Sequence, residues 1–141
     1  MTSYDKVYKA FSKRINDLKL LDLNDQEIIE YTHELMESAI PKFMMCKSDL
    51  FDRDDELGHF NVDLLPIEIE ILALLMTSEW LAPQIETTEI VNSFFGSKEE
   101  KFYSPANQLA TLQARQHDIE IQAPKMMNEY NIRSFVKETL S

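Results

Sequence analysis

The sequence LPIEIEILALLMTSEWL (residues 65–81) decides the fold, because it contains the longest apolar run in the chain. Its first part alternates like a strand, but the whole segment is too long and too rich in Ala and Leu for one. Pro66 suits the first position of a helix, where its missing N–H costs no hydrogen bond. We therefore predict a helix that is apolar on most sides and central to the protein. Trp80 near its end is interpreted as a core aromatic residue, with an interface anchor as the alternative.

The sequence after this segment contains further helix signals. Pro83 is predicted to bend or restart the central helix, and Gly96 is predicted to end it. Ser104 and Pro105 form a start signal, in which a hydroxyl cap precedes a proline at the first helical position. The helix that follows has a less complete apolar face, and Pro124 predicts a break in it.

An amphipathic helix is predicted near the N-terminus, where apolar residues recur at steps of three and four. Its apolar face comprises Tyr8, Phe11, Ile15 and Leu18. Thr2 and Asp5 have the spacing of a capping box at its start. A second stripe beside the apolar face is basic and comprises Lys6, Lys9 and Lys13.

The next helix is predicted to begin at Asn24 or Asp25, either of which can cap it. Four glutamates recur at steps of three and four, and the apolar residues centre almost opposite them. The glutamates are Glu27, Glu30, Glu34 and Glu37. The apolar set is Ile28, Thr32, Leu35, Met36, Ala39, Ile40 and Phe43. Pro41 is predicted to kink or end this helix near its last turn.

Residues 48–65 are predicted to form a loop or a short irregular helix that is rich in aspartate. Asp52, Asp54, Glu56 and Asp63 occupy the first, third, fifth and twelfth places of a possible calcium loop. The sixth place requires glycine for a sharp turn, and this chain has Leu57 there. We therefore interpret the segment as a solvated acidic loop.

The composition of the whole chain agrees with a helical fold. The chain has 141 residues and only two glycines, whereas turn-rich sandwiches and barrels, dinucleotide fingerprints and P-loops all consume glycine. We predict an all-α, single-domain bundle of about four to five helices over residues 1–128, followed by an extended C-terminal tail over residues 129–141. A single cysteine excludes an internal disulfide and fits a reducing compartment. No apolar stretch is long enough to cross a membrane.

The chain offers few residues for catalysis or metal binding. His33 and Glu34 begin like a zinc-protease motif, but position 37 is Glu rather than the second histidine ligand. His59 and His117 stand alone, and Cys46 lies among apolar residues as expected of an inert thiol. We find no catalytic constellation, so we predict no enzyme activity, no metal and no cofactor.

The net charge of −11 is concentrated in one part of the sequence. Residues 1–21 carry five basic and two acidic groups, a net charge of +3, and residues 22–70 carry three basic and fourteen acidic groups, a net charge of −11. Residues 71–141 carry six basic and nine acidic groups, a net charge of −3. Regular acidic spacing on a helix costs stability through repulsion. It indicates either a solvated face or a surface kept negative to meet a basic neighbour or to repel nucleic acid.

The tail contains apolar residues that are difficult to bury at the end of a domain. They are Tyr130, Ile132, Phe135 and Val136. Two alternatives remain open: they pack back onto the bundle, or they dock on another chain.

Four stretches resemble the head–tail connector, or adaptor, proteins of tailed phages. They are RDDEL (53–57), EWLAPQI (79–85), GSK (96–98) and FYSPANQL (102–109). The resemblance covers roughly residues 4–121 and lies in structural motifs rather than catalytic ones. The sequence departs from the family near Pro124 and the pair Met126 and Met127, which interrupt an expected continuous and more basic helix end.

This resemblance implies a virion neck protein that is made in the host cytoplasm and joins a ring, typically of twelve copies, under the portal. Such a ring extends the DNA channel without binding DNA specifically and offers a platform to the next neck component. The acidic and basic stripes are then candidates for subunit contacts or for the channel wall, and the tail for docking on the portal. The alternative function is an acidic binding module, such as a DNA-mimicking inhibitor of a basic partner.

Overall fold

Helix α3 (Pro66–Phe95) forms the centre of the structure, as its apolar sequence predicts. The computed structural model describes residues 1–15, 25–95 and 105–140, and within these ranges the protein has four α-helices and a small sheet. Every residue from 71 to 77 of α3 is buried, because other helices pack on several sides of this segment. The predominantly all-α fold predicted from the sequence is confirmed.

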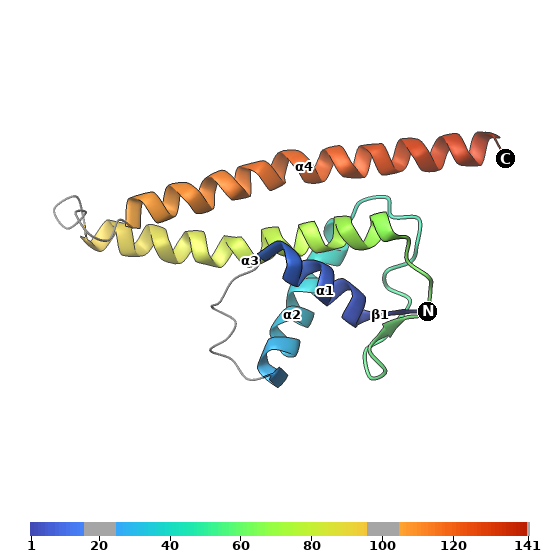
Figure 1. Ribbon diagram of the computed structural model, residues 1–141, viewed down its shortest axis with the longest axis horizontal. Coiled ribbons are helices and arrows are strands. Elements are labelled where there is room, and N and C mark those ends of the chain that lie inside the picture. The colour runs from blue at the N-terminus through green and yellow to red at the C-terminus, as the bar shows by residue number, and fades with distance from the viewer. Residues whose placement is uncertain (16–24, 96–104, 141) are drawn as a thin grey trace.

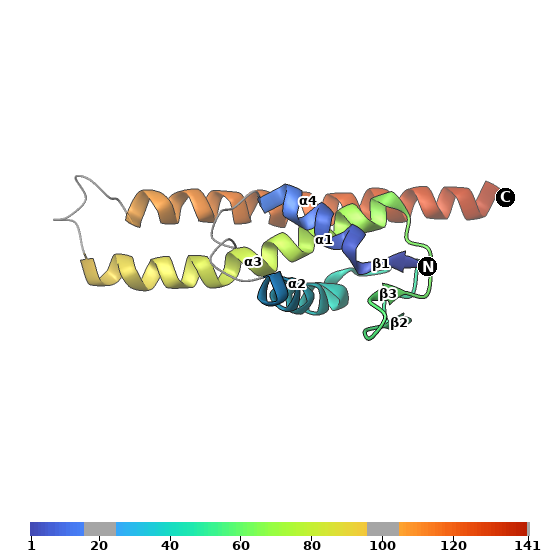
Figure 2. The same ribbon diagram turned by 60° about the horizontal axis from the view of Figure 1, so that its bottom comes forward.

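The remaining helices surround α3 unequally. Helix α4 (Pro105–Leu140) runs antiparallel along α3, and its C-terminal end extends beyond the start of α3 (Figures 1 and 2). Helices α1 (Tyr4–Ile15) and α2 (Asp25–Ala39) both pack against α3, and in Figure 1 they lie below it while α4 lies above it. The short 3₁₀ turn η2 (Ile40–Lys42) contains Pro41 and follows α2, so the helix ends two residues before Pro41, in agreement with the predicted kink or end there.

The core joins residues that are far apart in the sequence. Val7 and Phe11 of α1 and Met36 of α2 are completely buried, and so is Phe60 of the sheet. Helix α4 contributes Ile119, Ala123 and Tyr130 to the same cluster. Since Tyr130 belongs to it, this core extends into the segment that we predicted as a tail.

A three-stranded antiparallel sheet lies at the N-terminal end of α1, with the strand order β1–β3–β2. Its strands are β1 (Thr2–Ser3), β2 (Arg53–Asp54) and β3 (His59–Phe60). The register places Phe60 between Thr2 and Arg53. Gly58 has a φ of 72°, which glycine adopts without steric cost, in the turn that joins β2 to β3. The prediction of a loop or irregular helix over residues 48–65 was therefore wrong for this hairpin.

The predicted capping box at the N-terminus was also wrong. Thr2 lies in β1, and its hydroxyl accepts a hydrogen bond from the Leu64 N–H at 2.8 Å. Helix α1 begins at Tyr4, and the hydroxyl of Ser3 accepts the Asp5 N–H at 3.2 Å. Because Thr2 pairs in β1, the side chain that caps α1 is that of Ser3, one residue later.

Neither internal proline ends a helix. Pro83 lies inside α3, although this helix changes direction along its length (Figure 2). Pro124 lies inside α4, and the predicted break there is wrong because α4 continues to Leu140. Pro124 is exposed, so water can satisfy the carbonyl group that loses its partner, and buried Ala123 and Tyr130 hold the helix against the core on both sides. Within the described residues, no helix is both long and apolar enough to span a membrane.

Candidate functional site

An open cleft lies between α1, α2 and the turn of the β2–β3 hairpin. It has a volume of about 540 Å³. Its lining combines aromatic rings, one aliphatic side chain and several carboxylates. The residues are Ser3, Tyr4, Asp5, Tyr8, Ile29, Glu30, His33, Glu34, Asp55 and Gly58. A cleft with this lining suits a cationic ligand, because the carboxylates create a negative potential within it.

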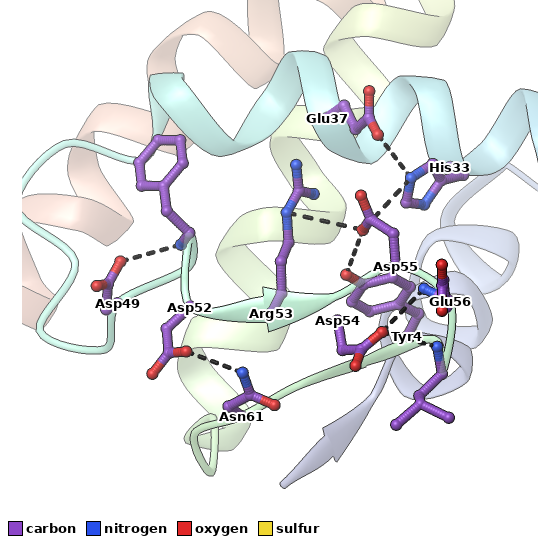
Figure 3. A network of polar contacts seen from close by, with 12 residues as sticks. Tyr4, His33, Glu37, Asp49, Asp52, Arg53, Asp54, Asp55, Glu56 and Asn61 are labelled. Atoms are coloured by element: carbon purple, nitrogen blue, oxygen red, sulfur yellow. Dashed lines mark hydrogen bonds and ion pairs between the residues drawn. The ribbon is translucent and has the colours of Figure 1, made fainter.

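Polar side chains from three elements meet at the edge of this cleft, and we call them the open cluster (Figure 3). Its members are Tyr4, Tyr8, His33, Glu37, Arg53 and Asp55, and all of them except Tyr8 are labelled in Figure 3. The Tyr4 hydroxyl donates a hydrogen bond of 2.6 Å to Asp55 Oδ1. His33 Nε2 lies 2.6 Å from Glu37 Oε1 and 3.8 Å from Asp55 Oδ1. The imidazole therefore lies between two carboxylates (Figure 3).

The local sequence explains why these groups meet. His33 and Glu37 are four residues apart and so lie on the same face of α2. Asp55 follows β2 in the hairpin, and the pairing of β3 with β1, which leads into α1, brings the hairpin turn toward that helix. The first residue of α1, Tyr4, is buried and packs edge-on against Phe60 with the ring centroids 4.9 Å apart. Its rigid placement holds the phenol against Asp55.

The ionisation of the cluster follows from these contacts. The hydrogen bond from Tyr4 lowers the pKa of Asp55, and the charges of Arg53 and His33 act in the same direction. Burial, followed by the hydrogen bond to Asp55, raises the pKa of Tyr4. Burial and the negative charge of Asp55 also raise the pKa of Tyr8, to about 12. Near neutral pH, Asp55 is thus an anion and both phenols are neutral.

Arg53 introduces a positive charge beside this group. Its Nε lies 3.9 Å from Asp55 Oδ1, and its side chain is largely covered by the protein. The Asp54 carboxylate is occupied differently, because it accepts the N–H groups of Glu56 and Leu57 at 3.0 Å each. Asp54 therefore stabilises the hairpin turn.

A second polar group surrounds the buried carboxylate of Glu68, and we call it the Glu68 cluster. It comprises Cys46, Ser48, Leu65, Glu68 and Tyr130. Glu68 is only 1% exposed, and five donors reach its carboxylate. Oε1 accepts the Leu65 N–H at 2.7 Å and the Ser48 hydroxyl at 2.8 Å, and Oε2 accepts the Tyr130 hydroxyl at 2.7 Å. Burial alone would raise the pKa of Glu68, but these hydrogen bonds outweigh it and lower the pKa.

This buried group joins three distant parts of the chain. Glu68 is the third residue of α3 and reaches back to the N–H of Leu65, which is half of a capping box. The Tyr130 hydroxyl also accepts the Lys47 N–H at 2.8 Å. Burial, with the nearby charge of Glu68, raises the pKa of the Cys46 thiol to about 12, which agrees with the predicted inert thiol.

Both predicted charged stripes lie on the surface. The four glutamates Glu27, Glu30, Glu34 and Glu37 are exposed on α2, and Lys6, Lys9 and Lys13 are exposed on α1. Lys9 forms an ion pair of 2.9 Å with Asp5 of its own helix. The structure brings two of the glutamates, Glu30 and Glu34, to the open cleft.

The four predicted docking residues differ in exposure, and only Tyr130 packs back onto the bundle. Tyr130 packs back and is 3% exposed, whereas Ile132 and Phe135 are 63% and 67% exposed. Val136 is also exposed. All four belong to α4, which is helical throughout the segment from 129 to 140.

Two of the residues that carried the family resemblance occupy structural positions. Trp80 is buried, and the Arg115 guanidinium lies 5.6 Å from the centroid of its ring. Pro105 is the first residue of α4. Gly96 and Ser104 lie outside the described residues, as does Leu18.

Sequence reasoning missed most of the open cluster. The i, i+4 spacing of His33 and Glu37 is visible in the sequence. Because the zinc-protease motif has histidine at position 37, Glu37 was taken as evidence against a metal site. Asp55 was one of many acidic residues, and Tyr4 was not selected at all. No local signal connects Tyr4 and Asp55 to this pair, because their contact depends on the strand pairing between β1 and β3. Comparisons with protein-family models, with curated proteins and with solved structures find no significant match.

Proposed function

We propose that this chain is a structural subunit of a phage head–tail connector ring, which joins the portal to the tail and extends the DNA channel. The family resemblance of the sequence motivates the proposal. The single structural observation that supports it best is the exposed apolar end of α4. An assembly protein requires surfaces that are unsatisfied in the isolated subunit, and this end of the helix has one.

The exposed side chains at the end of α4 form one stripe. Ile132, Phe135 and Val136 follow the spacing i, i+3, i+4, so they lie on the same side of the helix. Met126 and Tyr130 lie on a different side of α4, where they line a groove with residues at the start of α3. At 3.6 residues per turn, the apolar stripe faces away from that groove. An apolar helical stripe of this kind docks into a groove of another protein. We assign the portal as the partner of this stripe.

The charged stripes fit contacts between neighbouring copies. A ring is built from heterologous contacts, in which one face of a subunit meets a different face of the next. The basic stripe of α1 and the acidic stripe of α2 offer such complementary faces, and the sequence of α2 contains no Lys or Arg. Alternatively, the acidic stripe lines the channel, where a negative wall lets DNA pass without binding phosphates.

Electron microscopy of the protein mixed with the portal of the same phage tests the ring. We expect an added ring of density on the portal. The double variant I132S/F135S should lose this density and retain its helical circular dichroism. The matched control is Leu57→Ser, which also removes an exposed apolar side chain, but in the hairpin turn. A strictly monomeric protein that does not bind the portal would contradict the proposal.

Charge reversal separates the two roles of the acidic stripe. If Glu30 and Glu34 line the channel, the variant E30K/E34K should still form rings but impair DNA retention or ejection. If they contact the next subunit, the rings should fail to form. In that case, reversal of Lys6 and Lys13 to glutamate in the same chain should partly restore assembly.

The exposed glutamates of α2, a helix without Lys or Arg, also support a second candidate, an acidic module that binds a basic protein. This candidate predicts a 1:1 complex that dissociates at high salt, because exposed charge pairs are screened. A stoichiometric ring that persists in high salt excludes it.

A further inference from the structure

Three potential metal ligands converge in the open cluster. One donor atom each from His33, Glu37 and Asp55 lies within 4.8 Å of the other two. The ligands come from α2 and from the hairpin turn (Figure 3), and two of them, His33 and Asp55, line the cleft. We propose that these three side chains bind a Zn²⁺ ion. This inference does not depend on assembly into a ring.

The distances fit a small tetrahedral cation. Zn²⁺ binds histidine nitrogen and carboxylate oxygen at about 2.0–2.2 Å, which places neighbouring ligands about 3.4 Å apart. The separations from His33 Nε2 to Glu37 and Asp55 are 2.6 and 3.8 Å, so they bracket this value. Both carboxylates are about half exposed and can rotate by the small amount required.

A proton on His33 can bridge only two of the three ligand atoms, whereas a metal ion can contact all three. A hydrogen on His33 Nε2 can bond to Glu37 at 2.6 Å, but the Asp55 oxygen at 3.8 Å is beyond hydrogen-bond range. A cation located between the three atoms contacts all of them. Imidazole with carboxylates is a ligand set that suits Zn²⁺ among the abundant divalent ions.

Two tyrosines orient the ligands as metal sites require. The Tyr8 hydroxyl lies 2.9 Å from His33 Nδ1, so Nδ1–H can donate to it and leave the Nε2 lone pair for the metal. The Tyr4 hydroxyl holds Asp55 Oδ1 at 2.6 Å. Outer partners of this kind fix the tautomer and the direction of metal ligands.

The surroundings favour a cation on one side and oppose it on the other. Glu30 and Glu34 line the adjoining cleft and add negative potential. Arg53, 3.9 Å from Asp55, opposes the metal charge. Three protein ligands leave the fourth tetrahedral position open for water. The ion would connect α2 to the hairpin, two elements that are separated in the sequence.

Isothermal titration with ZnCl₂ on the full chain tests the site, together with the ¹⁵N resonance of the His33 imidazole. We expect one equivalent to bind and to shift His33 Nε2. His33→Gln and Glu37→Gln should each weaken binding by more than tenfold. Tyr8→Phe, which leaves all three ligands in place, should weaken it by about tenfold. The matched control is His117→Gln, because His117 is exposed on α4 and far from the cleft in sequence.

The outcomes are distinct. Glu37→Gln removes a charge from an exposed side chain, so it should remain folded and serves as the second variant if His33→Gln unfolds. Absence of binding, or an unmoved His33 resonance, overturns the proposal. Binding that survives both His33→Gln and Glu37→Gln places the metal elsewhere and also overturns it.

Discussion

The two polar clusters of this protein differ in how completely the chain satisfies them. The carboxylate of Glu68 is buried and receives five hydrogen-bond donors from three separate segments. In the open cluster, Glu37 and Asp55 are about half exposed, and Asp55 lies 3.8 Å from the imidazole that it faces. A fully satisfied buried group stabilises a fold, whereas a partly satisfied exposed group retains capacity for a ligand. The difference supports a structural role for the first cluster and the proposed metal-binding role for the second.

The largest expected effect comes from Glu68→Ala. This change leaves several buried donors without an acceptor, and each unsatisfied group costs about 1–3 kcal/mol. We expect the free energy of unfolding, measured with urea, to fall by about 3 kcal/mol or more. Glu70→Ala is the matched control two residues along α3. Glu70 is half exposed and pairs with Arg14 at 3.2 Å, so its loss should cost about 1 kcal/mol or less. Equal losses would contradict the comparison.

Tyr130→Phe should have the next largest effect. It removes the hydroxyl that donates to Glu68 at 2.7 Å and accepts the Lys47 N–H at 2.8 Å. We expect a loss of about 1–2 kcal/mol in the free energy of unfolding. The partner variant Tyr8→Phe, in the open cluster, should cost less, because Tyr8 and His33 are both partly exposed. A larger loss for Tyr8→Phe than for Tyr130→Phe would reverse the roles of the two clusters.

The pH dependence of stability sharpens the assignment of Glu68. Its hydrogen bonds outweigh burial and hold its pKa below the usual value near 4.3. The unfolded chain therefore binds this proton first as the pH falls, and the stabilisation present above about pH 4.3 is lost below it. Glu68→Gln has no carboxyl group that ionises, so its unfolding free energy does not contain this pH-dependent contribution. We expect the difference in unfolding free energy between the natural chain and Glu68→Gln to shrink as the pH falls through this range. A constant difference would show that ionisation of Glu68 does not matter.

The sequence predicts the local parts of this architecture better than the contacts between them. Apolar periodicity and Pro66 locate α3, and the glutamate spacing locates α2, because these signals lie within single helices. Pro124 misled the prediction, since helix propensity is a weak guide where tertiary packing holds the helix on both sides. The hairpin was missed because its strands have two residues each and one of them is Arg53–Asp54, which lacks an apolar pattern.

The same limit applies to the two clusters. Glu68 occurs within an alternating Ile and Glu segment, and its burial depends on Tyr130, 62 residues away. His33 and Glu37 are visible as an i, i+4 pair, but Asp55 becomes their neighbour only through the sheet. The exposed side chains Ile132 and Phe135 were recognised as difficult to bury, whereas the inward position of Tyr130 required the partner Glu68.

The smallest expected effect is that of His33→Gln in the absence of metal. His33 is partly exposed and its partner Glu37 is exposed, so their ion pair should contribute little to stability. We expect the free energy of unfolding to change by less than about 0.5 kcal/mol without Zn²⁺. With free Zn²⁺ at one hundred times its dissociation constant, the natural chain should gain about 2.7 kcal/mol and the variant much less. Thermal unfolding with and without ZnCl₂ measures both values. A large loss without metal would mean that the open cluster stabilises the fold as Glu68 does, and the contrast between the clusters would then fail.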